Sequence, residues 1–300
     1  MHILIADSGS TKTSWTLIDN NGHRLFDCHT QGINPTLLDD NQILQRLKFI
    51  VDALHDVKTL EGASSLHICF YGSGVTAQQQ QRMCHLLWQS FDVTCNILQI
   101  HSYSDIMAAA RATCQDGAGI VAILGTGSNS CLYDGNVVIQ QTPSLGYILG
   151  DEGGAVYIGK MLINNIYKQQ FHTDIRQAFE QYTHETMDSI IEKVYRQPMP
   201  NTFIASLTPF ISEYRIQFPE LNDIINRSFR AFIKHNILPY FHHQYSISDS
   251  LSTAVHAIGS IADAFRSEWK EALAQFQLRP GIITKDPIEG LVMYHSDCIK

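Results

Sequence analysis

The chain has 300 residues, 44% of them hydrophobic and 17% charged, which suits a globular protein of one large or two medium domains. Lys and Arg total 21 against 29 Asp and Glu, so the net charge of −8 argues against nucleic acid or an anionic membrane surface as a partner. The seven cysteines are scattered and form no CxxC pair, so neither a disulfide framework nor a zinc or iron–sulfur site is indicated. The sequence shows no signal-like start and no apolar run of about 18 residues, so we expect a cytoplasmic protein.

The first half of the chain opens as an antiparallel meander and continues as alternating strands and helices. β-Rich runs between turn residues predict the strands, and apolar residues at helical spacing predict the helices. In chain order we expect strands at His2–Ala6, Ser14–Ile18 and Arg24–Thr30, a helix over Ile43–Val57, a strand at Leu66–Tyr71, a helix at Gln80–Phe91, a strand at Thr94–Ile100 and a helix at Asp105–Cys114.

The pattern starts again at Gly119, with predicted strands at Ile120–Leu124, Ser130–Tyr133 and Val137–Gln141. Long helical stretches follow from Gly154 until a short strand at Thr253–Ile258. The restart suggests a duplication, so we divide the chain into domains 1–116 and 117–300. We expect an α/β fold with a cleft between the two domains.

The first predicted hairpin has an unusual turn, Asp7-Ser8-Gly9-Ser10-Thr11-Lys12-Thr13, which we call the first turn. Small residues and hydroxyls can direct amide and hydroxyl groups at a phosphate, and a carboxylate can hold hydrated Mg²⁺. It is not a Walker loop, because GxxxxGK[ST] is missing and a strand follows. An ordinary polar hairpin turn explains the same residue types.

The second predicted hairpin has a similar turn, Gly125-Thr126-Gly127-Ser128-Asn129, which we call the second turn. Taken singly, it has the same two explanations as the first turn. Two such turns in duplicated domains, facing each other across a cleft, would suit a nucleotide.

Other polar residues stand at strand ends or before helices. Asp105 ends a strand and opens a helix, so it is either a catalytic base or an N-cap. Asp151, in the glycine-rich segment Pro143–Gly154, could receive sugar hydroxyls or cap the helix that follows. Asn34 and Ser73 follow strands and could bind a polar ligand, although either could be plain loop chemistry.

The two turns and Leu149-Gly150-Asp151-Glu152-Gly153-Gly154-Ala155 occur in an order that resembles the N-acetylglucosamine kinase and BadF-type ATPase family. This family belongs to the superfamily of sugar kinases, actin and heat-shock chaperones. The resemblance covers nearly the full chain and implies the two-domain actin-like ATPase fold, a duplicated ribonuclease H-like fold. It implies phosphorylation of an amino sugar, N-acetylglucosamine or glucosamine, at the 6-OH with ATP and Mg²⁺.

The resemblance also implies roles for individual residues. Asp105 matches the catalytic aspartate, and Asp7 would hold the metal. The nucleotide would be bound by Asp7, Gly9, Ser10, Thr11, Lys12, Gly125, Thr126, Gly127, Ser228, Gly259 and Ser260. The sugar would be bound by Asn34, Ser73, Asp105, Ser128, Asn129, Ser144, Leu145, Gly146 and Asp151.

The sequence departs from the family pattern in two places. Ser8 stands where a third glycine is usual, and Ser260 replaces the second glycine of the adenosine motif. The iron–sulfur cysteines of the BadF-type activators have no counterpart, which disfavours that branch. A sensor or activator that hydrolyses ATP for a partner protein remains the alternative function, and the family suggests a homodimer.

Overall fold

The computed structural model describes residues 1–9, 11–55, 65–91, 96–168, 170–242 and 253–297. The chain forms two compact units, Met1–Gly117 with Pro287–Lys300, and Ala118–Asp286. The sequence analysis placed all of 117–300 in the second domain, whereas the segment from Pro287 groups with the first unit. This segment packs closely against the first unit at Gly290, where an added Cβ would lie 2.1 Å from the carbonyl oxygen of Ala112.

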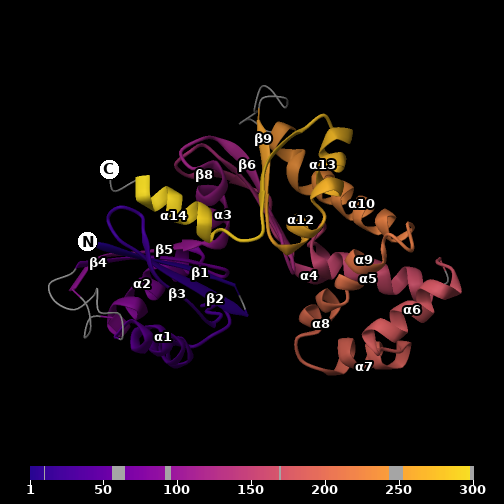
Figure 1. Cartoon of the computed structure of the whole chain (residues 1–300), viewed down its shortest axis with the longest axis horizontal. Helices are drawn as coiled ribbons and strands as arrows, with labels where there is room; N and C mark the ends of the chain where they lie inside the picture. The colour runs from indigo at the N-terminus through magenta and orange to yellow at the C-terminus, as the bar shows by residue number, and fades with distance from the viewer. Residues whose placement is uncertain (10, 56–64, 92–95, 169, 243–252, 298–300) are drawn as a thin grey trace. The chain divides into compact units, whose positions relative to one another are not determined.

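The first unit is a five-stranded sheet with helices on both faces (Figure 1). Its elements are β1 (His2–Ser8), β2 (Lys12–Ile18), β3 (Arg24–Gln31), α1 (Asp40–His55), β4 (Ser65–Gly72), α2 (Ala77–Phe91), β5 (Asn96–Ser104), α3 (Asp105–Cys114) and α14 (Ile288–Asp297).

The strand order of this sheet is β3-β2-β1-β4-β5. β1, β2 and β3 pair antiparallel, whereas β4 and β5 run parallel to β1, so the carboxyl ends of β1, β4 and β5 meet at one edge. Within this unit, α1 and α2 cover one face and α3 and α14 the other (Figure 1).

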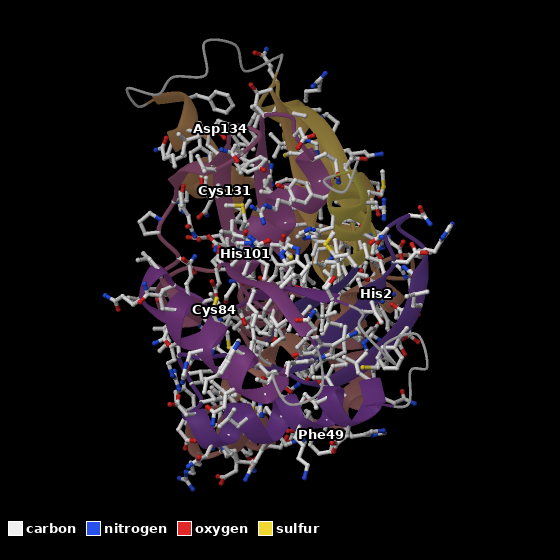
Figure 2. All side chains as sticks on the ribbon, turned by 90° about the vertical axis from the view of Figure 1, so that its left-hand side faces the viewer. His2, Phe49, Cys84, His101, Cys131 and Asp134 are labelled. Carbon is white, nitrogen blue, oxygen red and sulfur yellow. The ribbon has the colours of Figure 1, made fainter. Side chains whose placement is uncertain are left out.

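The buried stripe of α1 explains its position. Ile43, Leu47 and Ile50 recur at helical spacing and are fully buried with Leu4 and Phe70 of the sheet. Phe49, on the outer side of α1, is 65% exposed (Figure 2). At the start of α1, Asp39 and Gln42 cap each other reciprocally: the side chain of Asp39 accepts from the amide of Gln42 over 2.9 Å, and the side chain of Gln42 accepts from the amide of Asp39 over 3.0 Å.

The second unit repeats this plan with additional helices. Its elements are β6 (Gly119–Leu124), β7 (Ser128–Tyr133), β8 (Val138–Gln141), α4 (Gly146–Leu149), α5 (Ala155–Tyr167), α6 (Thr173–Thr183), α7 (Met187–Arg196), α8 (Pro200–Ser206), α9 (Pro209–Tyr214), α10 (Leu221–Phe232), the π-helix η2 (Ile233–Ile237), α11 (Pro239–His242), β9 (Ala254–Ile258), α12 (Ser260–Ala264), α13 (Arg266–Gln275) and β10 (Arg279–Thr284).

The strand order here is β10-β9-β6-β7-β8. β6, β7 and β8 form an antiparallel meander, and β9 and β10 run parallel to β6, so the sheet has the same order and directions as the first one. The two mixed sheets confirm the expected α/β fold, and their common topology agrees with the proposed duplication. Among the described residues, no helix combines the length and the apolar character needed to cross a membrane.

Candidate active site

The sheet of the first unit brings three of the expected site residues to one edge. Ser8, Gly72 and Ser104 lie side by side at the carboxyl ends of β1, β4 and β5. Asp7 therefore lies at the end of β1, and Ser73 and Asp105 directly follow β4 and β5. Ligands of parallel α/β sheets commonly bind at such an edge, where loops leave the strands.

The first turn is a tight hairpin closed by the amide of Gly9, which donates to the carbonyl of Lys12 over 2.9 Å. Thr11 and Lys12 are exposed, and Asp7 is half-buried. Ser10, which the sequence analysis assigned to the nucleotide, lies outside the described residues. The turn thus presents a carboxylate, a hydroxyl and a cation within six positions of the chain.

Ser8, which stands where the family usually has a glycine, is buried and stabilises the first turn through hydrogen bonds of its side chain. Its Oγ lies 2.7 Å from Oγ1 of Thr13, accepts from the amide of Ile33 over 2.8 Å and donates to the carbonyl of Ile33 over 3.0 Å. The hydroxyl therefore fixes the first turn to the loop that carries Asn34. The substitution adds an anchor and leaves the hairpin intact.

Asn34 and Ser73 lie in neighbouring loops. Oδ1 of Asn34 accepts from the amide of Thr36 over 3.0 Å and packs against Gly74, where an added Cβ would be 2.0 Å away. The amide of Ser73 donates to the carbonyl of Ser8 over 2.9 Å, so this loop is tied to β1. Within the described part of the chain, Oγ of Ser73 is buried without a hydrogen-bond partner. Buried polar groups are usually paired, so this hydroxyl is available to a polar ligand.

Asp105 is the first residue of α3, and the cap is its neighbour Ser104, whose side chain accepts from the amide of Met107. The simple N-cap explanation of Asp105 is therefore wrong. Oδ1 of Asp105 accepts from the amide of Ile106 over 2.8 Å. Burial raises the pKa of the carboxyl, which makes it a stronger base than an exposed aspartate.

The second turn is held by the start of α5. The amides of Ala155 and Val156 donate to the carbonyls of Gly125 and Thr126 over 2.8 and 3.0 Å, which uses two otherwise unpaired amides of the helix end. Gly154 lies so close to Gly127 that an added Cβ would be 2.7 Å from its carbonyl oxygen. This contact explains why Gly154, the last glycine of the Gly150–Gly154 (GDEGG) segment, has no side chain, while Thr126 stays exposed.

Asp151 lies beside the second turn. Its Oδ1 accepts from the amide of Ser128 over 3.3 Å, and its Oδ2 would be 2.7 Å from a Cβ added to Gly127. The cap of α5 is Gly154, which makes no side-chain bond, so Asp151 is not the helix cap of the alternative interpretation. Burial raises the pKa of Asp151, although the Ser128 amide and the Lys160 ammonium act in the opposite direction.

The remaining sugar candidates of this unit lie at the start of α4 and in β7. Ser144, Leu145 and Gly146 are exposed, and Gly146 has the positive φ of +74° that favours glycine. Oδ1 of Asn129 accepts from the amide of Ser130 and from Nε2 of Gln141, over 2.9 and 3.0 Å, which fixes the orientation of the Asn129 side chain.

Sequence reasoning missed Lys160, a half-buried residue of α5. Its Nζ donates to the carbonyl of Tyr147 in α4 over 2.5 Å, and its charge acts on both Asp151 and Glu152. Lys160 lies nine residues after Asp151, and only the path of α5 brings the two together. No motif in the sequence marks it.

Gly259-Ser260, the segment that resembles the family's adenosine motif, lies next to the second turn. Gly259 has φ +122°, and an added Cβ would be 2.3 Å from the carbonyl oxygen of Leu124, so a side chain at this position is excluded. Ser260 is exposed as the first residue of α12. Ser228 is fully buried and accepts from the amide of Gly153 over 3.1 Å, so we leave it out of the nucleotide site.

The structure is similar over its full length to the putative N-acetylglucosamine kinase of Porphyromonas gingivalis. The two chains are 35% identical, the match covers 98% of this chain and 99% of the other, and the TM-score is 0.88. This chain belongs to the N-acetylglucosamine kinase family of actin-like sugar kinases. The resemblance expected from the motifs is confirmed.

More distant similarities within the actin-like sugar kinase fold concern the fold alone. The protein of the same designation from Chromobacterium violaceum is 14% identical, with 98% of both chains covered and a TM-score of 0.72. A ROK family glucokinase from Streptomyces griseus, solved with glucose and AMPPNP, is 15% identical over 99% of both chains, with a TM-score of 0.60. No protein-family model and no curated protein matches the sequence.

Proposed function

We propose that the protein transfers the γ-phosphoryl group of ATP to the 6-OH of an amino sugar, N-acetylglucosamine or glucosamine. The observation that carries this proposal is Asp105, a carboxylate whose pKa is raised by burial and which follows β5 at the same sheet edge as Asp7. Membership of the sugar kinase family supports the reaction class, and the identity of the 35% identical relative supports the amino sugar.

The nucleotide is bound, in this proposal, by residues of both units. The first turn with Thr11 and Lys12, the second turn with Thr126, and Gly259 with Ser260 supply amides, hydroxyls and one cation. Mg²⁺ fits Asp7, because a single half-buried carboxylate beside a polar turn suits an ion that keeps most of its waters. When bound, the ion neutralises charge on the phosphates.

In the chemical step, the sugar 6-oxygen forms a bond to the γ-phosphorus while the bond from that phosphorus to the bridging oxygen of ADP breaks. The hydroxyl proton passes to the carboxylate of Asp105, and ADP leaves with the bonding electrons. The Ile106 amide holds one carboxylate oxygen of Asp105 in place. Positioning of this kind supplies most of the catalysis in phosphoryl transfer.

The sugar is bound, in this proposal, by the polar side chains of Asn34 and Ser73 in the first unit and of Ser128, Asn129 and Asp151 in the second. Ser73 brings a buried hydroxyl without a partner among the described residues. Asp151 brings a carboxylate that accepts hydrogen bonds from sugar hydroxyls. Ser144, Leu145 and Gly146 form a flanking wall.

The test is ADP release by the purified protein with ATP and Mg²⁺, in the presence of N-acetylglucosamine, glucosamine, N-acetylmannosamine, muramic acid or glucose. We expect N-acetylglucosamine or glucosamine to stimulate release far above the sugar-free rate. Equal slow release with every sugar would overturn the proposal and favour the sensor or activator function.

A further inference from the structure

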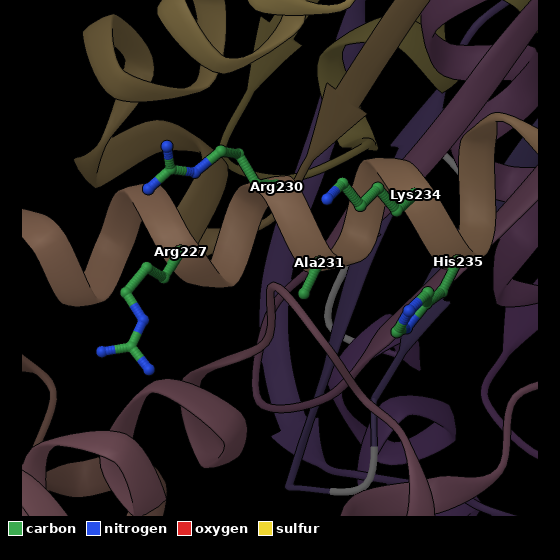
Figure 3. Close-up of a pocket in the computed structure, with 5 residues that line it drawn as sticks. All are labelled: Arg227, Arg230, Ala231, Lys234 and His235. Atoms are coloured by element: carbon green, nitrogen blue, oxygen red, sulfur yellow. The ribbon is translucent and has the colours of Figure 1, made fainter.

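A basic pocket opens on the outer side of α10 and η2 in the second unit (Figure 3). It has a volume of about 390 Å³, within the range of small-molecule pockets. Five residues line it: Arg227, Arg230, Ala231, Lys234 and His235. None of them belongs to the motifs from which the kinase reaction was inferred.

Helical spacing explains the shape of the pocket. Arg227, Ala231 and His235 follow one another at intervals of four residues, and Arg230 and Lys234 form the adjacent row (Figure 3). The short side chain of Ala231 leaves a depression among four long ones. The π-helix η2 begins directly after α10, and such segments are frequent at functional sites.

The pocket is positively charged in a protein whose net charge is −8. Asp223 is the carboxylate paired with both arginines, at 3.7 Å from Arg227 and 3.8 Å from Arg230, which are longer than hydrogen bonds. Within the described residues, Lys234 has no ion pair. Arg227 and Arg230 thus share the exposed carboxylate of Asp223, and Glu152 lies 3.0 Å from the fifth lining residue, His235. Against these two carboxylates stand two arginines and a lysine, so the pocket carries a small surplus of positive charge.

The pocket is also attached to the segment that holds Asp151. Nδ1 of His235 lies 3.0 Å from Oε1 of Glu152, and Oγ of Ser228, on the buried side of α10, accepts from the amide of Gly153 over 3.1 Å. Glu152 and Gly153 directly follow Asp151. A ligand in the pocket is therefore bound on the same helix that supports the proposed sugar-binding segment.

We propose that this pocket is an additional anion site that binds the phosphate groups of a small molecule. Arginine and lysine form charge-assisted hydrogen bonds with phosphate oxygens, and guanidinium groups can do so through two N–H groups at once. The phosphate belongs to a phosphorylated compound other than the nucleotide substrate, because the proposed function binds the nucleotide at the two turns. The site lies outside the residues assigned to catalysis and goes beyond the proposed function.

The test is equilibrium dialysis of radiolabelled inorganic phosphate against the full chain at low ionic strength. The variant Arg230→Gln/Lys234→Gln should bind phosphate about tenfold or more weakly, because it loses two charge-assisted contacts. Lys48→Gln/Lys168→Gln removes the same charge from exposed positions elsewhere and should bind as the wild type does. Asp223→Asn removes the competing carboxylate and should bind more tightly.

Equal affinity in Arg230→Gln/Lys234→Gln and in the control variant would overturn the proposal. Repeating the titration with saturating AMPPNP fills the proposed nucleotide site and leaves only phosphate binding elsewhere. The difference between the wild type and Arg230→Gln/Lys234→Gln should persist under this condition, and its disappearance would overturn the proposal. The assay contains no sugar and needs no turnover. Its result therefore tests the anion site even if the protein proves not to phosphorylate an amino sugar.

Discussion

Asp105 and Asp151 are carboxylates whose pKa values are both raised by burial, but the groups around them differ. Asp105 accepts from backbone amides at the start of a helix, with that of Ile106 at 2.8 Å. Asp151 has the amide of Ser128 and the nearby Lys160 ammonium, which favour its ionised form. We therefore assign proton transfer to Asp105 and hydrogen bonding of the sugar to Asp151.

Asp105→Asn is predicted to lower kcat by a factor of about 10² to 10⁴, the usual contribution of a general base, while sugar affinity changes little. Asparagine retains an acceptor for the Ile106 amide, so α3 should stay folded. In the wild type, activity should rise with pH through the raised pKa of Asp105 as the carboxyl loses its proton.

The matched control is Asp116→Asn, which makes the same chemical change at an exposed residue just beyond the other end of α3. Steady-state rates and sugar titrations of both variants check the assignment. Near-normal turnover by Asp105→Asn would contradict it.

Lys160→Met is predicted to raise the KM for the sugar about tenfold. The variant loses the charged hydrogen bond to the carbonyl of Tyr147 and the positive charge that favours the ionised form of Asp151. The KM for ATP should change by less than about twofold, because Lys160 acts through the sugar-binding segment. Initial rates at varied sugar and varied ATP separate the two effects.

Lys160→Arg keeps the positive charge and should restore part of the sugar affinity, which a loss of packing alone would not explain. An unchanged sugar KM in Lys160→Met would show that Lys160 has no positioning role.

At the scale of elements, α14 is attached to its unit by a buried polar cluster. Arg111 of α3 donates to the hydroxyl of Tyr71 over 2.9 Å, and that hydroxyl lies 2.9 Å from Nε2 of His295 in α14. His295 is 5% exposed, and burial, with the nearby charge of Arg111, lowers its pKa to about 3. A neutral His295 can accept a hydrogen bond from the hydroxyl of Tyr71, which in turn accepts one from Arg111.

Acidification should weaken this attachment. The pKa of His295 is lower in the folded protein than its ordinary value of 6.5, so the unfolded state binds more protons and stability falls as pH decreases below 6.5. At 1.36 kcal/mol per pH unit, the expected loss from this residue is about 3 kcal/mol by pH 4.5. Chemical unfolding at pH 7.5, 5.5 and 4.5 measures it.

His67 and His101 lie in the same region and also have lowered pKa values, so they add to the pH dependence in the same direction. His295→Gln retains a hydrogen-bonding side chain but cannot titrate. The wild type and this variant should therefore differ in the slope of stability against pH, and parallel slopes would contradict the account of α14.

The elements of the two meanders could be predicted from the sequence because their strands alternate with turn residues over a few positions. β1, β6 and α3 follow the predicted ranges to within two residues at each end. The sequence analysis did not separate the helices from α5 to α11, because long apolar-rich stretches do not show where one helix ends and the next begins. It also did not predict the strand β10. The return of α14 to the first unit depends on Gly290 and His295, which contact residues more than 170 positions away.

The candidate site could be predicted only where residues stand in local motifs. The two turns and the GDEGG segment pointed to Asp7 and Asp151, and the strand end before a helix pointed to Asp105, as the site residues that we propose. The support given by Ser8 and the attachment of Tyr147 by Lys160 depend on tertiary contacts between separate elements. The sequence analysis assigned both Ser228 and Ser260 to the nucleotide. Only the structure shows that Ser228 is fully buried whereas Ser260 is exposed.

For the whole molecule, duplication has given each unit a hairpin turn at the same place in its sheet. β1 and β2 enclose the first turn, and β6 and β7 enclose the second. The first turn is accompanied by Asp105 and the second by Asp151 and the adenosine motif. The two units thus share a topology but carry different side chains beside their turns, and each unit would contribute a different part of the proposed reaction.

The most direct test of the central claim is phosphorus–proton correlation NMR of the product formed from ATP, Mg²⁺ and N-acetylglucosamine or glucosamine. The account predicts a phosphorus nucleus coupled to the two protons on C6 of the sugar, because transfer to the 6-OH places phosphorus three bonds from them. Coupling to the anomeric proton, or free inorganic phosphate as the sole product besides ADP, would contradict it.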